Sequence, residues 1–337
     1  MTMANSDIYK KLAERLNYPP SEYLMKILKK MATEQEAAIL LELPAAPEQL
    51  AQKFSMTEAA LSEKMDEFMA RGLTVSTSKG PRLVREVTQL HDASLASAKK
   101  YIDAELLDLW KEFYEKEWRK HIGEEWGKMQ RPFARVIPAW KSLESSSQMS
   151  QGDVLPEENM QTIMREAEMI AVVPCSCRVP LRNCDAPLEV CFQFNKWADY
   201  AIKRGSGKKL TLDQALEANA LAEESALVHM QPMVTSSLSL ICSCCADCCA
   251  LIDPGVAYGT VKNALLKSRY QPVIDPEACI GCQECVDRCP FIAIEMKKFP
   301  QGKKLKGALI AENCFGCGVC VVGCEAGAIN MKIAQAA

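Results

Sequence analysis

A helical period of hydrophobic residues is clearest between residues 100 and 126. The repeating positions are Ile102, Leu106, Leu109 and Phe113, widened by Leu107, Trp110, Tyr114, Trp118 and Ile122. Residues three and four apart share one side of a helix, so this pattern predicts a helix with a broad apolar face. A face this wide and aromatic favours burial between domains rather than contact with a cofactor.

Residues 33–85 are patterned as three short helices followed by a β-hairpin. Thr33, with Glu36 three residues later, is a capping box that begins the first helix. The third helix is expected over about residues 57–71, with Gly72 as its C-terminal cap. Two short apolar segments around a Ser-Lys-Gly-Pro turn predict the hairpin. This order of elements resembles a winged-helix DNA-binding domain.

The charge of the third helix argues against DNA as the partner of this module. Four acidic residues, Glu58, Glu63, Asp66 and Glu67, outnumber the basic residues Lys64 and Arg71. A recognition helix needs cations and amides to contact phosphates and base edges. The hairpin adds only the basic residues Lys79, Arg82 and Arg85. We therefore expect the module to dock or dimerise protein chains, because a fold does not determine a function.

Composition narrows the class of protein. The chain has 337 residues, a formal net charge of -3 and 25% charged residues, which is ordinary for a soluble protein and gives no support to a nucleic-acid or membrane-surface partner. No run of 18 apolar residues predicts membrane insertion, and the N-terminus lacks the apolar stretch of a secretory signal. The 17 cysteines are therefore expected to be kept reduced for metal binding, in a cytoplasmic protein.

Eight of the cysteines form two runs of four between residues 279 and 324. The first run is Cys279, Cys282, Cys285 and Cys289, followed by Pro290, and the second is Cys314, Cys317, Cys320 and Cys324. Two-residue spacing lets three thiolates converge on one [4Fe–4S] cluster, whereas the fourth cysteine reaches the other cluster. The spacing predicts a crossed assignment: site one is Cys279, Cys282, Cys285 and Cys324, and site two is Cys314, Cys317, Cys320 and Cys289. Glycines inside the loops, Gly281, Gly316 and Gly318, are expected to have positive φ.

Residues 270–333, which include these runs, resemble the bacterial-type two-cluster ferredoxin domain. The chain departs from that pattern at Glu325, where Pro is frequent, and in an insertion between the runs. The insertion carries five lysines, Lys297, Lys298, Lys303, Lys304 and Lys306. They are either a solvated turn or a docking surface for an acidic or flavin-bearing partner.

Nine further cysteines lie outside these runs. They are Cys175, Cys177, Cys184, Cys191, Cys242, Cys244, Cys245, Cys248 and Cys249. A helix capped at Thr211 with Gln214 separates the first four from the last five and could fold the two groups together. Their spacing leaves three alternatives: one further [4Fe–4S] cluster, two further clusters, or structural zinc. His229 precedes the second group, and a structural role for this histidine is favoured over metal ligation.

The order of several segments extends the resemblance to about residues 130–333. They are RVIP at 135–138, VVPCSCR at 172–178, ALVH at 226–229, and ICSCCADCC before the two runs. Together they are similar to large 4Fe–4S ferredoxin-like proteins of anaerobes. That resemblance implies an electron-transfer component that works beside a redox enzyme or flavoprotein subunit.

These features predict an α+β fold whose N-terminal half is mainly helical. The expected segments are a helical lead-in (1–30), a winged-helix-like module (31–88), a helical linker region (89–155), a cysteine-rich helical metal-binding domain (156–268) and a dicluster ferredoxin domain (269–337). Within the middle domain, the apolar run 170–173 predicts a short buried strand.

The leading functional prediction is a multi-cluster iron–sulfur protein that relays low-potential electrons and forms no catalytic site of its own. One alternative is a redox-sensing transcription regulator that uses the winged helix. Another is an enzyme whose substrate meets an open iron in the middle domain. A homo-oligomer is compatible with each of them.

Overall fold

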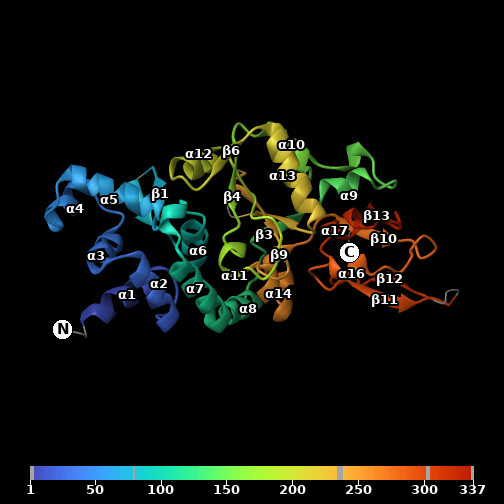
Figure 1. The fold of residues 1–337 in the computed structure, drawn as a ribbon, viewed down its shortest axis with the longest axis horizontal. Coiled ribbons are helices and arrows are strands. Elements are labelled where there is room, and N and C mark those ends of the chain that lie inside the picture. Colours follow the sequence, from blue (N-terminus) through green and yellow to red (C-terminus); the bar gives the residue numbers. More distant parts are fainter. Residues whose placement is uncertain (1–3, 79, 234–237, 301–303, 335–337) are drawn as a thin grey trace. The chain divides into compact units, whose positions relative to one another are not determined.

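The computed structural model of the chain describes residues 4–78, 80–233, 238–300 and 304–334 (Figure 1). Its contacts fall into two units, and each is described by itself. The first unit is Met1–Arg119 with Ser176–Arg182 and Ala201–Gly207, and the second is Lys120–Cys175 with Asn183–Tyr200 and Lys208–Ala337.

The first unit is mainly helical, as the sequence predicts. Its elements are α1 (Ala4–Arg15), α2 (Glu22–Met31), α3 (Glu34–Glu42), α4 (Pro47–Lys53), α5 (Glu58–Ala70), β1 (Thr74–Thr77), β2 (Gly80–Leu83), α6 (Val87–Leu95), η1 (Lys99–Tyr101), α7 (Ala104–Phe113), a π-helical turn η2 (Tyr114–Trp118) and α11 (Arg178–Leu181). The predicted helix across 100–126 is confirmed as α7, η2 and α8 (Arg119–Gly127). Trp110, Phe113 and Trp118 are buried, and Phe113 stacks on Trp118 with ring centroids 5.7 Å apart.

The three helices and hairpin predicted over residues 33–85 are present as α3, α4, α5, β1 and β2. The capping box of Thr33 and Glu36 is confirmed, and Gly72 follows α5 with φ +81°. The two cations of α5 are engaged internally. Lys64 Nζ lies 2.9 Å from Glu36 Oε1, and Arg71 lies 3.1 Å from the same oxygen.

The second unit is built on a seven-stranded sheet in the order β6-β4-β5-β8-β7-β3-β9. Its strands are β3 (Ala134–Ile137), β4 (Ile170–Pro174), β5 (Glu189–Phe194), β6 (Lys208–Leu210), β7 (Val228–Pro232), β8 (Leu240–Cys244) and β9 (Leu265–Leu266). The pairs are antiparallel except β3 with β9. The short strand predicted at 170–173 is confirmed as β4.

The prediction of a helical middle domain is incomplete, because helices and a mostly unpredicted sheet share the cysteine-rich segment. The strands are short, which weakens their sequence pattern. Cysteines also occupy positions in β5 and β8, so the alternation of apolar residues is missed when cysteines are counted only as metal ligands. The helices of this region are α9 (Trp140–Glu144), η3 (Gln151–Asp153), η4 (Pro156–Glu158), α10 (Met160–Glu166), α12 (Lys196–Lys203), α13 (Leu212–Glu224), α14 (Ile252–Ala257) and α15 (Val261–Ala264).

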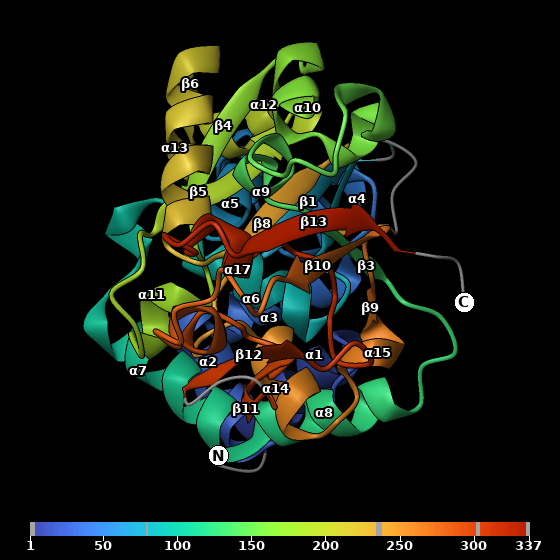
Figure 2. The same cartoon turned by 90° about the vertical axis from the view of Figure 1, so that its right-hand side faces the viewer.

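The two faces of the sheet have different neighbours. α10 and α13 cover one face, where Phe192, Phe194 and Ile241 join their core (Figure 2). Successive side chains of a strand point to opposite faces, so Cys191 on β5 and Cys242 and Cys244 on β8 share the other face. The capping box of Thr211 with Gln214 begins α13, as predicted.

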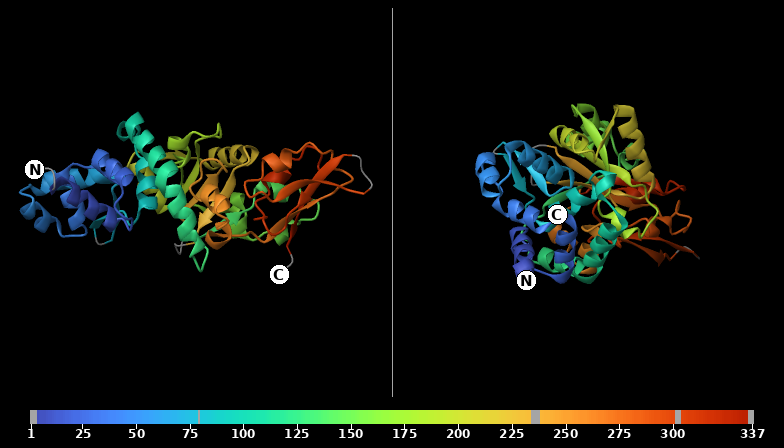
Figure 3. Two further views of the ribbon diagram at one scale, coloured as in Figure 1. Left: turned by 90° about the horizontal axis from the view of Figure 1, so that it is seen from below. Right: turned by 60° about the vertical axis from the view of Figure 1, so that its left-hand side comes forward.

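The C-terminal segment, orange to red in Figure 3, consists of two small antiparallel sheets and two short helices. β10 (Tyr270–Ile274) pairs with β13 (Ile329–Ile333), and β11 (Ile294–Lys298) pairs with β12 (Leu305–Leu309). α16 (Glu284–Asp287) and α17 (Val319–Val322) each follow two cysteines of a run. Within the described residues, every helix is too short or too polar to cross a bilayer.

Candidate metal centres

Site one surrounds a cavity in the C-terminal segment. The cavity is lined by all four of its cysteines, Cys279, Cys282, Cys285 and Cys324, together with Ile280, Met296 and Ile329. Burial, followed by the nearby thiols Cys279 and Cys282, raises the pKa of Cys285 to about 11. The rim is open, because Cys282 is exposed and Ile280 is 59% exposed.

Site two surrounds a second cavity and is more deeply buried. It is lined by Cys289, Cys314, Cys317 and Cys320 with Phe291, Phe315 and Val319. The backbone N–H groups of Ala293 and Gly316 donate to the sulfur atoms of Cys289 and Cys314, each at 3.3 Å. Such bonds favour the thiolate form. Burial raises the pKa of the Cys317 and Cys320 thiols, since desolvation penalises an isolated thiolate.

Glycines allow the backbone to turn tightly around these cavities. Gly281, Gly316 and Gly318 have φ of +77°, +69° and +76°, as predicted. A Cβ at Gly316 would lie 2.1 Å from the Tyr270 carbonyl oxygen, and one at Gly318 would lie 2.0 Å from Ser142 Oγ. A side chain at either position would therefore displace the loop that carries the site-two cysteines.

The donor set suits the group that the sequence predicts. Each cavity brings together four thiols from two separate runs, with apolar side chains around them. Soft thiolate ligands and an apolar shell are typical of [4Fe–4S] clusters. When bound, such clusters supply one-electron redox chemistry.

The nine middle cysteines do not form one group. Cys175, Cys191, Cys242, Cys244 and Cys249 make the first set, here called the five-thiol group. Cys191 hydrogen-bonds with Cys175 and Cys242, and Cys244 with Cys242 and Cys249. These hydrogen bonds, together with complete burial, raise the pKa of the Cys191 and Cys244 thiols well above the usual value.

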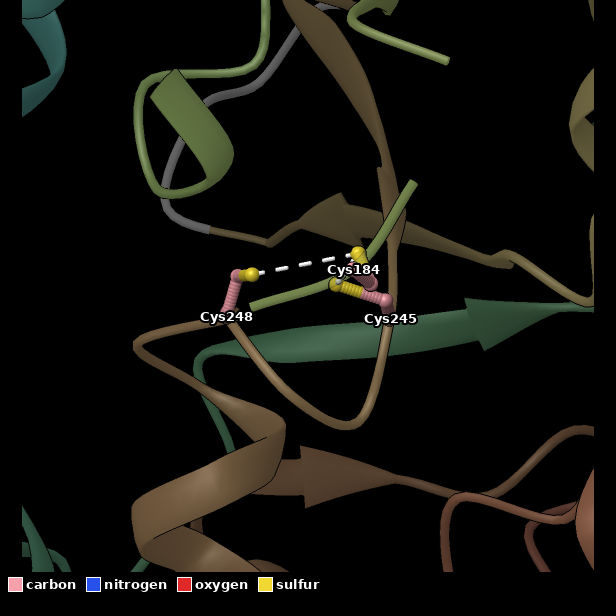
Figure 4. Close-up of side chains that lie close together, drawn as sticks. All are labelled: Cys184, Cys245 and Cys248. Carbon is pink, nitrogen blue, oxygen red and sulfur yellow. Dashed lines mark hydrogen bonds between the residues drawn. The ribbon is translucent and has the colours of Figure 1, made fainter. Parts of the chain in front are cut away.

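Cys184, Cys245 and Cys248 form a second set, here called the three-thiol group (Figure 4). Cys184 Sγ lies 3.7 Å from Cys245 Sγ and 3.9 Å from Cys248 Sγ. All three sulfur atoms lie within 4.8 Å of one another. The three cysteines are not linked by disulfides.

Cys177 belongs to the first unit. Its sulfur lies within 4.8 Å of ligand atoms of His91 and Asp92. His91 Nδ1 is 2.9 Å from Asp92 Oδ1, and Ser176 Oγ donates to the same carboxylate oxygen at 2.7 Å.

His229 has structural partners in this fold. Its Nδ1 lies 3.2 Å from Ser243 Oγ, and its Nε2 lies 3.6 Å from Glu223 Oε1. The fully buried Glu223 carboxylate also accepts hydrogen bonds from the backbone N–H groups of Trp140 (2.8 Å) and Lys141 (3.0 Å). Burial alone would raise the pKa of Glu223, but His229 and these donors together lower it.

Sequence reasoning missed the polar residues that join the C-terminal segment to the sheet. Arg288 donates to the carbonyl oxygens of Val319 (2.8 Å), Glu223 (2.9 Å) and Glu224 (2.9 Å). Glu158 accepts from Arg269 Nε and from the Tyr270 hydroxyl, both at 2.7 Å. Charged residues far apart in sequence carry no local pattern, so only the fold could identify these pairs.

An apolar core connects the five-thiol group with site two. One cluster of buried side chains contains Cys244 and Cys249 together with Cys317, and Cys242, Cys289 and Cys314 pack against it. Phe291 and Phe315 lie in the same core with ring centroids 4.4 Å apart. The thiols of both regions therefore border one continuous low-dielectric environment.

Two cavities of four cysteines in a small hairpin-containing segment define a 4Fe–4S dicluster domain at the C-terminus. In agreement, residues 278–329 match the family model described as "4Fe-4S dicluster domain". The chain is also 28% identical over 101 residues to a probable iron–sulfur subunit of the Frd operon of Proteus vulgaris. That similarity covers 30% of this chain and 57% of the relative, so the chain spans little more than half the relative's length. The C-terminal segment is thus an iron–sulfur domain, which supports a role in electron transfer.

Proposed function

We propose that this protein relays single electrons between a redox enzyme and at least three iron–sulfur clusters in its second unit. Site one, with Cys279, Cys282, Cys285 and Cys324, holds one [4Fe–4S] cluster. Site two, with Cys314, Cys317, Cys320 and Cys289, holds the second. A third cluster is held by four cysteines of the five-thiol group. The relative named as an iron–sulfur subunit supports a role as the electron-transfer subunit of a larger redox system.

The single observation that carries this proposal is the apolar core shared by the five-thiol group and site two. Cys244 and Cys249 border the same buried cluster as Cys317, and the Phe291–Phe315 pair fills it. An apolar environment keeps charge reorganisation small and lets burial tune the potentials. The order of transfer that follows is five-thiol group, site two, site one.

Site one is the exit toward the partner in this order. Its Cys282 is exposed, whereas Cys317 and Cys320 of site two are buried. Lys297 and Lys298 are exposed on β11, and Lys304 is exposed just before β12. Lys306 instead donates to the Cys279 carbonyl oxygen, which ties it to site one. Lys303 lies outside the described residues. We assign the three exposed lysines to a docking surface for an acidic protein surface.

The N-terminal module is assigned to protein docking rather than DNA binding. Lys64 and Arg71, the cations of α5, both pair with Glu36, and Lys64 also pairs with Glu67 at 2.8 Å. Their charge is therefore neutralised within the module and is not offered to phosphates. A salt-dependent shift of duplex DNA by the full-length protein would contradict this assignment and favour a redox-sensing regulator.

The proposal is tested by the content of iron and acid-labile sulfide in anaerobically purified protein. We expect about twelve irons and twelve sulfides per chain. Cys191→Ala should remove about four of each, while Val190→Ala, a buried neighbour on β5 without a thiol, should remove none. About eight irons and sulfides in the wild type, unchanged by Cys191→Ala, would show that the sheet carries no cluster.

A further inference from the structure

The spacing of the three-thiol group differs from that of the cluster sites. Its Cys245 and Cys248 sulfur atoms lie 3.7 and 3.9 Å from that of Cys184, and all three lie within 4.8 Å of one another. Among the described residues, which include all 17 cysteines, no three cysteines of site one, site two or the five-thiol group all lie within 4.8 Å of one another, although pairs in the five-thiol group hydrogen-bond. The same fold therefore contains two kinds of thiol arrangement.

This spacing corresponds to one metal ion rather than to a cluster. Zn–S bonds are about 2.3 Å long, so thiolates at the corners of a tetrahedron around one ion lie about 3.8 Å apart. In a [4Fe–4S] cluster each thiolate binds a different iron, which places the ligand sulfurs farther apart. The distances of 3.7 and 3.9 Å agree with the single ion.

The local sequence agrees with this geometry. Cys245 and Cys248 are separated by two residues, the spacing of a zinc-binding turn, and they lie on the single loop that follows β8. Cys184 lies on the segment that follows α11, and Figure 4 shows its side chain beside those of Cys245 and Cys248. Asn183 Nδ2 donates to the Asp247 carbonyl oxygen at 3.1 Å, which holds the two loops together.

Backbone donors already face two of the sulfur atoms. The N–H of Ala186 hydrogen-bonds with Cys184 and that of Asn183 with Cys248. Such bonds commonly surround metal-bound sulfur. Cys248 is fully buried, Cys245 is 7% exposed and Cys184 is partly buried, so an ion bound here would be partly shielded from water.

We propose that Cys184, Cys245 and Cys248 bind a single zinc ion that is separate from the iron–sulfur clusters. Zinc suits the site because it prefers tetrahedral coordination by thiolates and undergoes no redox change. Binding displaces the thiol protons into solvent as the Zn–S bonds form. The ion joins the loop that leads to Cys191 with the loop that connects Cys244 and Cys249. It thereby fixes these two loops to each other without carrying electrons.

The first test is metal analysis with X-ray absorption at the zinc edge on the intact wild-type protein. We expect about one zinc per chain with at least three sulfur neighbours at about 2.3 Å. Less than about 0.2 zinc per chain in protein purified with zinc present, or a zinc shell of only nitrogen and oxygen, would overturn the proposal.

The second test separates the two thiol groups by substitution. Cys184→Ser and Cys248→Ser should each lower zinc at least about five-fold while iron and sulfide change little. Cys191→Ala, from the five-thiol group, is the matched control and should lower iron while zinc stays constant. Loss of iron and sulfide with unchanged zinc in the Cys184 and Cys248 variants would assign these thiols to a cluster. That result would overturn the proposal of a zinc site and leave the proposed electron relay through site one and site two unaffected.

Discussion

The dicluster segment and the middle cysteine region use the same side chain in different ways. In the first, eight thiols line two cavities and no three of them crowd together. In the second, the three-thiol group brings two of its sulfur atoms within 3.7 Å, while part of the five-thiol group lies on one face of β5 and β8. The difference shows that the number of cysteines does not determine the metal at a site. Three sulfur atoms that all lie close to one another can share a single metal ion, whereas sulfur atoms spread around a cavity suit a cluster.

The two regions also differ in how their thiols are brought together. All eight ligands of site one and site two lie within two runs of eleven residues, and glycines with positive φ shape the loops. The five-thiol group is assembled from the end of β4, from β5 and β8, and from the loop after β8, so it depends on the register of the whole sheet. Variants should therefore affect the two regions by different routes.

The largest effect is expected from Cys317→Ser at buried site two. Loss of a ligand should remove about four irons and lower the free energy of unfolding by more than about 4 kcal/mol, because metal binding contributes directly to folding. Cys282→Ser at the exposed rim of site one should destabilise the protein less. Iron content and anaerobic thermal unfolding measure both effects, and equal losses of stability would contradict the distinction between an inner and an outer site.

A smaller loss of stability is expected from Glu223→Gln. This change weakens the connection between α13, which packs on the sheet, and the segment beside site two. The fully buried carboxylate accepts two backbone N–H groups and lies near His229, so the change should cost about 3 kcal/mol in denaturant unfolding. Glu224→Gln is the matched control, because its exposed ion pair with Lys141 should contribute less than about 0.5 kcal/mol. Equal effects of the two variants would show that the buried network does not stabilise the unit.

Glu158→Gln should cost about 1–2 kcal/mol at pH 7, with a defined dependence on pH. Burial tends to raise the pKa of Glu158, but hydrogen bonds from Arg269, Tyr270 and Leu155 lower it below the usual 4.5. A lowered folded-state pKa stabilises the fold above about pH 4.5, and this contribution is lost as the pH falls through the folded-state value. Unfolding curves of wild type and variant should therefore converge at acid pH. Exposed Glu157→Gln is the control, and a difference that grows at low pH would refute the assignment.

The smallest effect is expected at the docking surface, which belongs to site one alone. Charge reversal of Lys297, Lys298 and Lys304 to Glu should slow reduction by the anion dithionite several-fold at low salt and accelerate reduction by a cationic viologen radical. The difference should disappear at high salt. Reversal of Lys10, Lys11 and Lys53 in the first unit changes the net charge equally and serves as the control. Unchanged rates and salt dependence would eliminate the surface.

Local sequence was sufficient to predict features that depend on residues close together in the chain. The capping boxes at Thr33 and Thr211, the helix of residues 104–127 and the positive φ of the loop glycines all follow from neighbours a few residues away. The grouping of cysteines at the two cavities also corresponds to the spacing of their runs. Most strands of the middle segment were not predicted, because strands of five or six residues depend on partners elsewhere in the chain.

The amino-acid order alone thus established an iron–sulfur segment with two four-cysteine runs, since ligand spacing and glycine placement act over a few residues. Tertiary structure was needed to divide the nine middle cysteines into a five-thiol group, a three-thiol group and Cys177. Sheet pairing between β4, β5 and β8 places Cys175, Cys191 and Cys242 together, while a loop contact brings Cys184 to Cys245 and Cys248. Long-range register and sulfur separation have no signature in local sequence, because they arise only when distant strands pair and exclude water.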